Sequence, residues 1–364
     1  MARPVDRIFL GIVIALLSGG FIVFLSASLG LLLREGARLS SIAGSQLMGI
    51  GLGAALGYGA SLVHYRAWRR FSPYLLLIAT ALTLLVFVPG VGVSHGGAYR
   101  WLDIAGFSFQ PAEFLKIGFV LFFAAFLASA REKVQSLRYG LLPFLLLVAV
   151  AGAILLLQPD TDSFVILGFT LFVMLLVAGA PLRHLALAAL IGSVLFAGLV
   201  FAKPYLKERV MTYLNPEAAD SKGARWQIDQ SLIAIGSGGA TGRGFGQSVQ
   251  KFSYLPEPVG DSIFAVASEE FGFSGAILLI ALFLAFLMRG LRIATHAPDS
   301  FSGLAALGTV ILLSLSAFVN IASMLGLVPL SGLPLPFVSH GGTAMLIALC
   351  EVGIVLNISR YQKS

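Results

Sequence analysis

Residues 242–272 read GRGFGQSVQKFSYLPEPVGDSIFAVASEEFG and join two different kinds of sequence. The first half is a glycine-rich polar loop, stiffened near its end by Pro256 and Pro258. The second half enters a long apolar stretch directly after one carboxylate, Asp261. An acid at the edge of an apolar span is an uncommon place for a charge and indicates a functional site.

The whole chain has the composition of a membrane protein. It is 58% hydrophobic and 11% charged, whereas a soluble domain carries roughly 25% charged residues. Stretches of about 20 apolar residues can cross a bilayer as helices, which satisfy their backbone groups internally. We therefore predict an all-α fold with ten transmembrane helices in a single membrane domain, residues 1–364. The predicted spans are 8–33, 42–64, 73–91, 111–129, 139–157, 163–180, 182–202, 262–288, 303–328 and 341–358.

Lys and Arg in the short loops predict the orientation, because these residues collect on the cytoplasmic side. With the amino terminus inside, the short outer loops hold only Arg34, Arg38 and Arg100. Both termini are therefore predicted to be cytoplasmic. The formal net charge of +7 follows from this topology and gives no indication of nucleic-acid binding.

Most of the irregular sequence lies on the predicted outer face. Segment 92–110 is a short, glycine-rich loop, and segment 203–261 is long enough to be functional. Within it, 225–235 (RWQIDQSLIAI) has the pattern of a short amphipathic helix on the membrane surface. The last outer loop, 329–340, contains three prolines and is predicted to be rigid.

Gly49, Gly53 and Gly57 form a ridge of small residues at four-residue spacing. Such a ridge lets two helices approach closely. Packing within this chain is the favoured interpretation, and docking of another protein's helix is the alternative.

Asp261 is the main candidate for chemistry. Directly before an apolar helix it suits the N-cap, and the same position would hold its carboxylate for use as a general base or cation ligand. Glu269 and Glu270 lie about two turns deeper, where carboxylates tend to face polar cavities. The sequence leaves the capping and catalytic roles of Asp261 open.

Glu113 and Lys116 form a second candidate site in the segment PAEFLKIG. Pro111 suits the first turn of a helix, and three-residue spacing places both charges on one face. A simple ion pair within the helix is one interpretation. However, Lys116 precedes a long apolar run, so we expect it to face a polar interior, where a cation suits a phosphate or pyrophosphate.

Two further motifs lie at the ends of predicted spans. Asp160 and Asp162, in QPDTDS, either bind a divalent cation or cap the following helix. After Ser339, the glycines Gly341 and Gly342 would let backbone amides at a helix start approach an anion.

Arg100 and Trp101 either anchor the chain in the membrane interface or contact a lipid headgroup. The sequence contains no P-loop, HExxH, GxSxG or Rossmann fingerprint in a suitable context. These observations indicate an outward-facing cavity for a phosphate-bearing ligand. They do not separate an enzyme acting on lipid-linked substrates from a transporter.

Four segments resemble, in order, the signature blocks of the SEDS family, which includes RodA and FtsW. They are FSFQPAEFLK, LLLQPDTDS, GFGQSVQKFSYLPEPVGDSIFAVASEEFG and GLVPLSGLPLPFVSHGG. The resemblance covers almost the whole chain. The phrase GQSVQKFSYLPE is more similar to FtsW, the division member, than to RodA, the elongation member.

This resemblance implies a peptidoglycan glycosyltransferase that polymerises lipid II at the outer face of the bacterial cytoplasmic membrane, at the division septum. It implies catalytic roles for Asp261, Glu113 and Lys116, and a divalent cation (Mg²⁺ or Mn²⁺). It also implies a class B penicillin-binding protein, an FtsI-like transpeptidase, as partner. A lipid II flippase and a RodA-type polymerase controlling cell shape are the alternatives.

The implied reaction inverts the donor sugar and releases undecaprenyl pyrophosphate. The candidate substrate-binding residues are Arg100, Trp101, Arg243, Gln250, Ser339, Gly341 and Gly342, and the candidate metal ligands are Asp261 and Asp160. The chain departs from the family where HTDF reads VGDS, QPDLGT reads QPDTDS and SYGG reads SHGG. The aspartate is kept, but Asp162 adds a carboxylate and the missing His removes a ligand or hydrogen bond.

Overall fold

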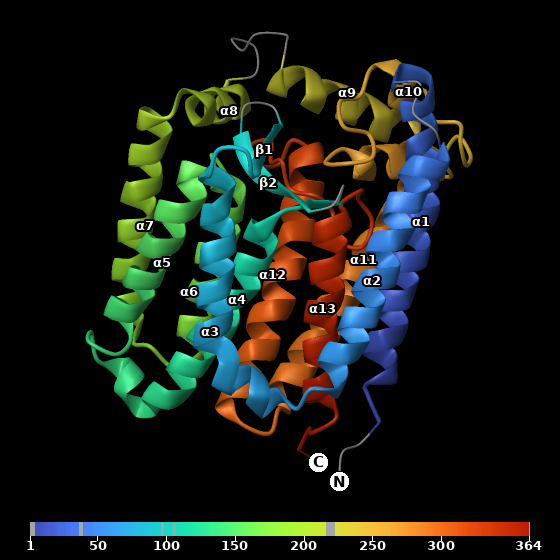
Figure 1. Cartoon of the computed structure of the whole chain (residues 1–364). Helices are drawn as coiled ribbons and strands as arrows, with labels where there is room; N and C mark the ends of the chain where they lie inside the picture. The colour runs from blue at the N-terminus through green and yellow to red at the C-terminus, as the bar shows by residue number, and fades with distance from the viewer. Residues whose placement is uncertain (1–3, 36–38, 96–97, 105–106, 216–222, 364) are drawn as a thin grey trace.

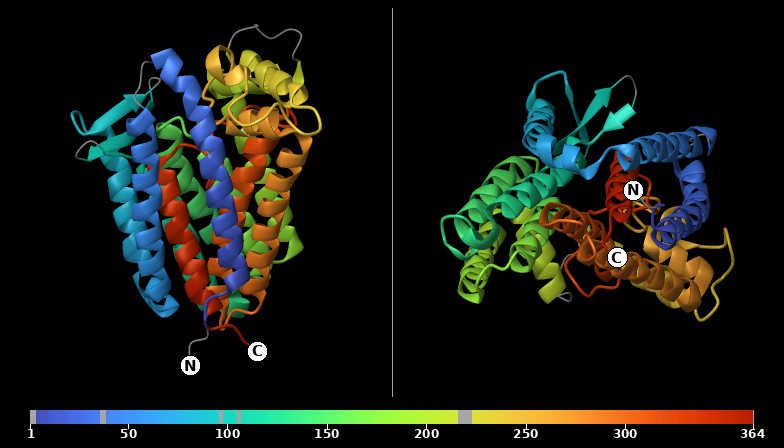
Figure 2. Two further views of the ribbon diagram at one scale, coloured as in Figure 1. Left: turned by 90° about the vertical axis from the view of Figure 1, so that its right-hand side faces the viewer. Right: turned by 90° about the horizontal axis from the view of Figure 1, so that it is seen from below.

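The computed structural model describes residues 4–35, 39–95, 98–104, 107–215 and 223–363. Long helices run roughly parallel in one bundle, and both chain ends lie at the same end of it (Figure 1). Figure 2 shows the same arrangement from the side and from below. Among the described helices, seven are long and apolar enough to cross a membrane, and two more are shorter and apolar. The prediction of a mostly helical, multi-pass membrane protein is confirmed.

Each predicted span corresponds to a helix. They are α1 (Arg7–Glu35), α2 (Leu39–Leu62), α3 (Tyr65–Leu84), α4 (Pro111–Ala130), α5 (Leu141–Leu157), α6 (Thr161–Val177), α7 (Leu182–Ala202), α11 (Ile263–Thr295), α12 (Ser300–Met324) and α13 (Gly342–Ser359). The number of membrane crossings and the inside–outside orientation stay predictions. Arg38, used to predict that orientation, lies outside the described residues.

The predicted bounds of α3 are wrong. The helix starts at Tyr65 rather than near residue 73, and the His64 side chain accepts a hydrogen bond from Arg66 N at 3.2 Å at its start. It includes Pro73 and ends at Leu84, before the short helix η1 (Leu85–Phe87). Hydropathy marks the apolar part of a helix, whereas the first turns of α3 are rich in arginine and were therefore missed.

Segment 92–110 forms a small antiparallel sheet, not the predicted loop. Its strands are β1 (Gly92–His95), β2 (Ala98–Ile104) and β3 (Phe107–Phe109), in the order β1-β2-β3. Gly92 pairs with Leu102, which in turn pairs with Phe109. The many glycines hid the strand pattern, because cross-strand pairing rather than local propensity stabilises a sheet this short.

The sheet lies at the end of the bundle opposite the termini, which we call the distal end (Figure 1). Three helices of the long 203–261 segment lie there too: α8 (Pro204–Leu214), α9 (Ala224–Ser237) and α10 (Gln250–Ser253). The helix predicted over 225–235 is confirmed as α9. Lys222, in the same segment, lies outside the described residues.

The glycine ridge of α2 packs against α13. A Cβ at Gly53 would lie 2.8 Å from Leu349 Cδ1, and a Cβ at Gly57 would overlap Leu349 O. On α13, a Cβ at Gly353 would collide with the carbonyl of Gly57. Packing within the chain is therefore the correct interpretation of the ridge.

Substitution of Gly57 by leucine is expected to destabilise the protein. The new side chain must separate two helix backbones, and overpacking of this kind costs about 3 kcal/mol of unfolding free energy. Gly59→Leu is the matched control, because a Cβ at Gly59 meets no atom within 4 Å. Thermal unfolding in detergent compares the two. Equal melting temperatures for both variants would contradict a stabilising role for the contact.

Candidate functional site

Asp261 lies immediately before α11, where the helix N-cap is Ser262. The predicted capping role of Asp261 is therefore wrong, and its carboxylate makes no hydrogen bond or ion pair with the described residues. The backbone around it is held firmly, since Asn320 Nδ2 donates to Asp261 O at 2.8 Å and to Leu333 O at 2.7 Å. The main chain at Asp261 is therefore held in place, while its carboxylate remains available to a ligand or a proton.

Gly332 lies between Asp261 and an ion pair formed by Asp162 and Arg209. A Cβ at Gly332 would lie 3.6 Å from Asp261 Oδ2, 3.7 Å from Asp162 Oδ2 and 3.9 Å from Arg209 Nη2. Asp162 Oδ2 accepts hydrogen bonds from Arg209 Nη1 at 3.0 Å and from Gly332 N at 2.9 Å. The missing side chain of Gly332 thus leaves a space bordered by two carboxylates and one guanidinium group. We call it the Gly332 space.

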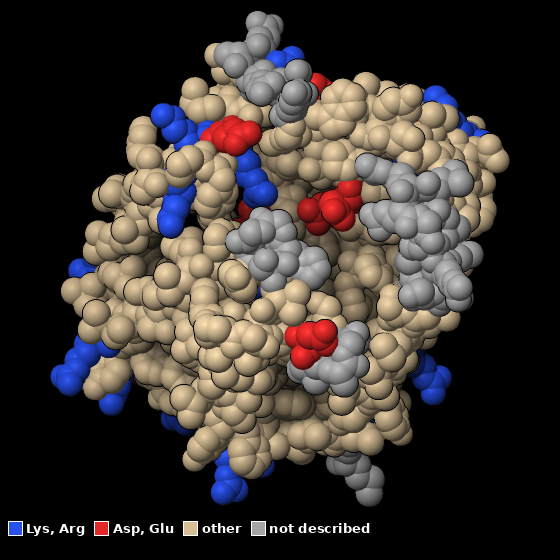
Figure 3. All heavy atoms as spheres, turned by 45° about the horizontal axis from the view of Figure 1, so that its top comes forward, with Lys and Arg blue, Asp and Glu red and all other residues tan. Residues whose placement is uncertain are grey.

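Arg209 was not selected from the sequence, where it is one of several bases in a long loop. It lies on α8 between Tyr205 and Tyr213, at four-residue spacing that places all three on one helix face. The Tyr205 hydroxyl shares a hydrogen bond with Thr161 Oγ1, and Tyr213 Oη donates to Leu327 O at 3.0 Å. These contacts fix α8 at the site. Figure 3 shows acidic and basic side chains around a hollow at the distal end.

Asp261 has an unusual acidity. Burial, together with the neighbouring Glu257 and Asp162 charges, raises the pKa of its carboxyl to about 7, against the opposing effect of Arg209 and Arg100. The side chain nevertheless remains partly exposed. A carboxyl with a pKa near neutrality is well suited to accept a proton as a general base.

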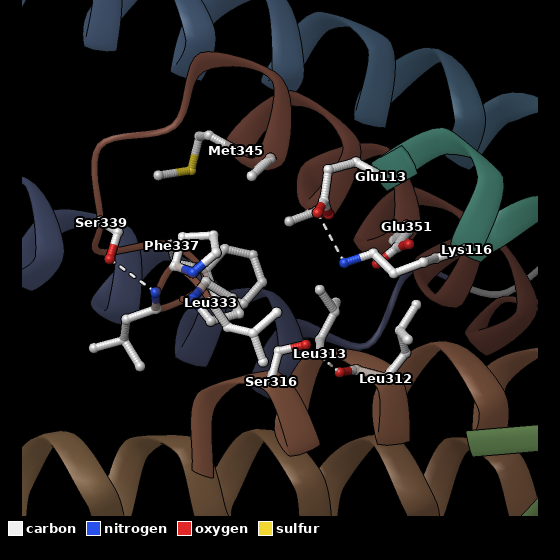
Figure 4. Close-up of a pocket in the computed structure, with 15 residues that line it drawn as sticks. Glu113, Lys116, Leu312, Leu313, Ser316, Leu333, Phe337, Ser339, Met345 and Glu351 are labelled. Carbon is white, nitrogen blue, oxygen red and sulfur yellow. Dashed lines mark hydrogen bonds and ion pairs between the residues drawn. The ribbon is translucent and has the colours of Figure 1, made fainter. Parts of the chain in front are cut away.

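Lys116 and Glu113 form the predicted ion pair, with 2.8 Å between Lys116 Nζ and Glu113 Oε1. Both side chains line a cavity of about 30 Å³, and Glu351 of α13 enters the same cavity (Figure 4). This volume holds about two water molecules. Glu351 is buried, and its Oε2 has no hydrogen-bond partner within the described ranges. Glu351 could not be recognised from the sequence, because a single acid in an apolar span does not reveal which face it occupies.

The proline-rich loop 329–340 borders both sites. Gly332 faces Asp261, whereas Leu333, Phe337 and Ser339 line the Lys116 cavity. Ser339 Oγ also donates to Gly260 O at 2.8 Å. The loop therefore joins the backbone next to Asp261 to the wall of the second site.

Arg100 and Asp160 lie near the junction of α5 and α6. Arg100, on β2, donates from Nε to Gln158 O at 2.9 Å and from Nη2 to Pro159 O. A cation is favourable at these carbonyls, which follow the C-terminal end of α5. Asp160 Oδ1 accepts from Ser163 N at 3.3 Å, which confirms its capping role, while Asp160 Oδ2 has no partner in the described part of the chain.

Trp101 lies half-buried on β2 beside Arg100, where its backbone pairs with Val93. Gly341 is the N-cap of α13. A Cβ at Gly49 would lie 3.1 Å from Gly342 Cα, so Gly342 takes part in the α2–α13 contact.

Arg243 and Gln250 lie beside Glu269 rather than Asp261, and Arg243 Nε also donates to Ser237 O at 3.4 Å. Arg243 Nε lies 3.6 Å from Glu269 Oε1, and Gln250 N donates to Glu269 Oε2 at 3.3 Å. We expected Glu269 and Glu270 to face a polar cavity. Instead, their carboxylates accept hydrogen bonds from the 242–251 loop.

The donor set at the Gly332 space fits a divalent cation. In the described residues, no group of three or more His, Cys, Asp and Glu side chains is placed to hold a metal. However, Mg²⁺ commonly binds one or two protein carboxylates and keeps several waters. Asp261 and Asp162 provide two such carboxylates around a space that a side chain would fill. The structure thus places Asp162 beside Asp261, while Asp160 caps α6.

The sequence model of the cell cycle protein family of FtsW, RodA and SpoVE matches residues 6–364. Stage V sporulation protein E of Bacillus subtilis is 42% identical over 318 residues, which cover 87% of each chain. A probable peptidoglycan glycosyltransferase FtsW of Trichlorobacter lovleyi is 36% identical over 354 residues, 97% of this chain and 93% of the relative.

Two solved structures are similar along almost the whole chain. One, described as structural coordination of polymerization and crosslinking by a peptidoglycan synthase complex, has a TM-score of 0.82 at 27% identity and 99% coverage of both chains. The other is the rod shape determining protein RodA of Thermus thermophilus, with a TM-score of 0.71 at 28% identity, covering 99% of this chain and 98% of that chain.

Proposed function

We propose that this chain, which belongs to the FtsW, RodA and SpoVE family of cell cycle proteins, is a glycosyltransferase that polymerises lipid II into peptidoglycan. The names of the relatives support the reaction class. The observation that carries the proposal is the Asp261 carboxylate, which has a pKa of about 7 and borders a space lined by other charged groups.

In the proposed reaction, Asp261 accepts the proton of the 4-hydroxyl of the incoming GlcNAc. The oxygen then bonds to the anomeric carbon of the growing chain, and the bond from that carbon to undecaprenyl pyrophosphate breaks. The bonding electrons leave with the pyrophosphate. A single displacement of this kind inverts the α-linked donor to a β-linked product, without a covalent enzyme intermediate.

The leaving pyrophosphate gains negative charge, and cations placed around it would stabilise the transition state. Arg209 is the cationic residue at the Gly332 space, so we assign to it, rather than to the candidate substrate-binding residue Arg243, the contact with the leaving pyrophosphate. Lys116 lies on the other side of the 329–340 loop from the Gly332 space, in a cavity with Glu113 and Glu351. From that cavity its ammonium group would act on the charge of the pyrophosphate. A divalent cation bound by Asp261 and Asp162 would supply further positive charge to the pyrophosphate.

We further propose that the chain works in the bacterial cytoplasmic membrane at the division septum, with a class B penicillin-binding transpeptidase as partner. Relatives named FtsW support the division role, and the similar synthase complex supports a partnered polymerase. An elongation role of the RodA type is the alternative within the same reaction class, supported by the similarity to RodA.

A polymerisation assay with purified protein and lipid II tests this function, with and without the partner transpeptidase. Glycan strands separated on a gel are the expected product. Movement of labelled lipid II across vesicle bilayers, with no polymer under either condition, would contradict the proposal and favour a flippase.

The polymerisation rate is expected to rise as the pH increases from about 6 to 8, because the base acts in its ionised form and the pKa of Asp261 is about 7. A cation beside a carboxylate favours the ionised form. Raising the Mg²⁺ concentration is therefore expected to shift the rise to lower pH. Initial rates of lipid II consumption at two Mg²⁺ concentrations measure both effects. A rate independent of pH over this range would argue against Asp261 as the base.

A further inference from the structure

The helix that follows Asp261 is broken at Gly272. Inside α11, Gly272 has φ 65° and ψ −165°, a conformation that residues with a side chain rarely adopt. The break separates a distal half-helix, residues 263–271, from the longer part that continues to Thr295. Backbone groups freed by a break inside an apolar span need partners from elsewhere in the protein.

The glycine-rich segment 239–244 provides these partners. Four backbone hydrogen bonds join this loop to α11, two on each side of the break. Before the break, Arg243 N donates to Glu269 O and Gly244 N to Glu270 O, both at 3.0 Å; after it, Phe273 N donates to Gly239 O at 2.8 Å and Ser274 N to Ala240 O at 3.1 Å. A Cβ at Gly272 would collide with Gly242 N, and a Cβ at Gly242 would collide with Glu270 O. The loop is therefore bonded to both parts of α11, and its backbone contacts the half-helix closely.

Glu269 fastens the half-helix to the start of α10. Its carboxylate accepts hydrogen bonds from Ser248 Oγ at 2.6 Å, Val249 N at 3.0 Å and Gln250 N at 3.3 Å. With Ser237 Oγ at 3.4 Å, four donors satisfy one buried carboxylate, which makes this contact strong and specific.

Glu270 fastens the half-helix to the loop and to α1. Lys251 Nζ lies 2.6 Å from Glu270 Oε1, and both side chains are fully buried. Ser26 Oγ, on α1, donates to the same carboxylate oxygen at 2.6 Å, and Lys251 Nζ donates to Ser26 Oγ at 2.9 Å. A buried ion pair costs desolvation energy and is weak evidence for stability alone. The buried Lys251–Glu270 pair therefore indicates a role other than stabilising the fold.

We propose that Lys251 and Glu270 are positioning residues for Asp261, which act by fixing the tilt of the half-helix. Asp261 lies directly before this half-helix, and Asn320 holds its carbonyl group at that end. The Lys251–Glu270 pair holds the opposite end. A displacement of about 1 Å of a catalytic group can reduce a rate by up to about 10²-fold. The inference rests on the proposed glycosyltransferase function.

A set of three variants tests the inference. Lys251→Met and Glu270→Gln each leave one buried charge or polar group without its partner, so each is expected to lower the melting temperature. The double variant contains no unpaired charge, and its melting temperature is expected to recover. Its kcat with lipid II is nevertheless expected to fall about 10-fold, with KM unchanged, because Asp261 is displaced. A double variant with recovered stability and unchanged kcat would overturn the inference.

The ion pair of Asp6 and Arg289 is the matched control. It also joins the α1 region to α11, with 2.7 Å between Arg289 Nη2 and Asp6 Oδ2, but beyond the Gly272 break. Asp6→Asn combined with Arg289→Met is expected to leave kcat unchanged. A loss equal to that of the Lys251 and Glu270 double variant would also overturn the inference, since the effect would not depend on the half-helix.

Two further measurements keep the outcomes separate. If the double variant does not fold, Ser26→Ala weakens the pair without creating an unpaired charge. It is expected to lower kcat about threefold through the same displacement, and an unchanged kcat would overturn the inference. Asp261→Asn is measured in the same assay. Absence of polymer from the wild-type protein contradicts the proposed function itself, and normal polymerisation by Asp261→Asn contradicts the role of Asp261 as the base that is positioned. An inactive Asp261→Asn beside a fully active pair variant contradicts only the positioning role.

Discussion

Replacement of Asp261 by asparagine is expected to reduce the rate of lipid II polymerisation by about 10³-fold, within the range for loss of a general base. Asparagine has nearly the same shape but cannot take up the proton of the sugar hydroxyl. The Asp261 side chain makes no hydrogen bond with the described residues, so the folded structure is expected to persist. Above pH 7 the variant should be slightly more stable, because burial raises the pKa of Asp261 and its ionised form therefore opposes folding.

Glycan strand formation and thermal unfolding of the same preparations measure both parts of this prediction. Asp229→Asn is a suitable control, because Asp229 is an exposed acid on α9, paired with Arg225 at 3.5 Å. It should polymerise lipid II normally. Wild-type polymer yield from Asp261→Asn would show that another group removes the proton.

Replacement of Lys116 by methionine is expected to destabilise the protein by about 3 kcal/mol, because it leaves the partly buried Glu113 carboxylate without its cation. Combining Lys116→Met with Glu113→Gln removes the unpaired charge and is expected to restore much of the stability. Polymerisation is expected to stay low in the double variant, because the Lys116 ammonium group, proposed to act on the pyrophosphate from across the 329–340 loop, is still missing.

Thermal unfolding in detergent and the lipid II assay separate the two roles of Lys116. Lys133→Met serves as the control, because Lys133 is an exposed lysine on the short helix η2 (Arg131–Gln135). A Lys116→Met variant that unfolds at the wild-type temperature would contradict a stabilising ion pair. Full activity of the stable double variant would contradict the electrostatic role.

Local features of the sequence were predicted well where one short segment contains the whole signal. Apolar length located a helix at each predicted span, and the three-residue spacing of Glu113 and Lys116 gave their ion pair. The spacing of Gly53 and Gly57 indicated a helix contact, although only the structure shows that its partner is α13. The errors in the predicted elements are also local in origin. The arginines in the first turns of α3 lower the hydropathy there, and the glycines of segment 92–110 obscure the strand pattern of the sheet.

The composition of the candidate site could be predicted only in part. Asp261 was identified from its place between a stiff loop and an apolar span, because that pattern lies within one segment. Arg209 and Glu351 were missed, since neither stands out from its sequence neighbours. Asp162 was recognised as an added carboxylate, but its place beside Asp261 depends on contacts with Gly332 and Arg209.

The sequence by itself determined that this chain crosses a membrane in many helices, because transfer of long apolar segments out of water is a property of each segment alone. Tertiary structure decided which charges meet. Asp162, Arg209, Asp261 and Gly332 come from four separate parts of the chain, and helix packing brings them around one space. The pKa of Asp261 has the same origin, because burial and neighbouring charges, rather than the residue itself, raise it to about 7.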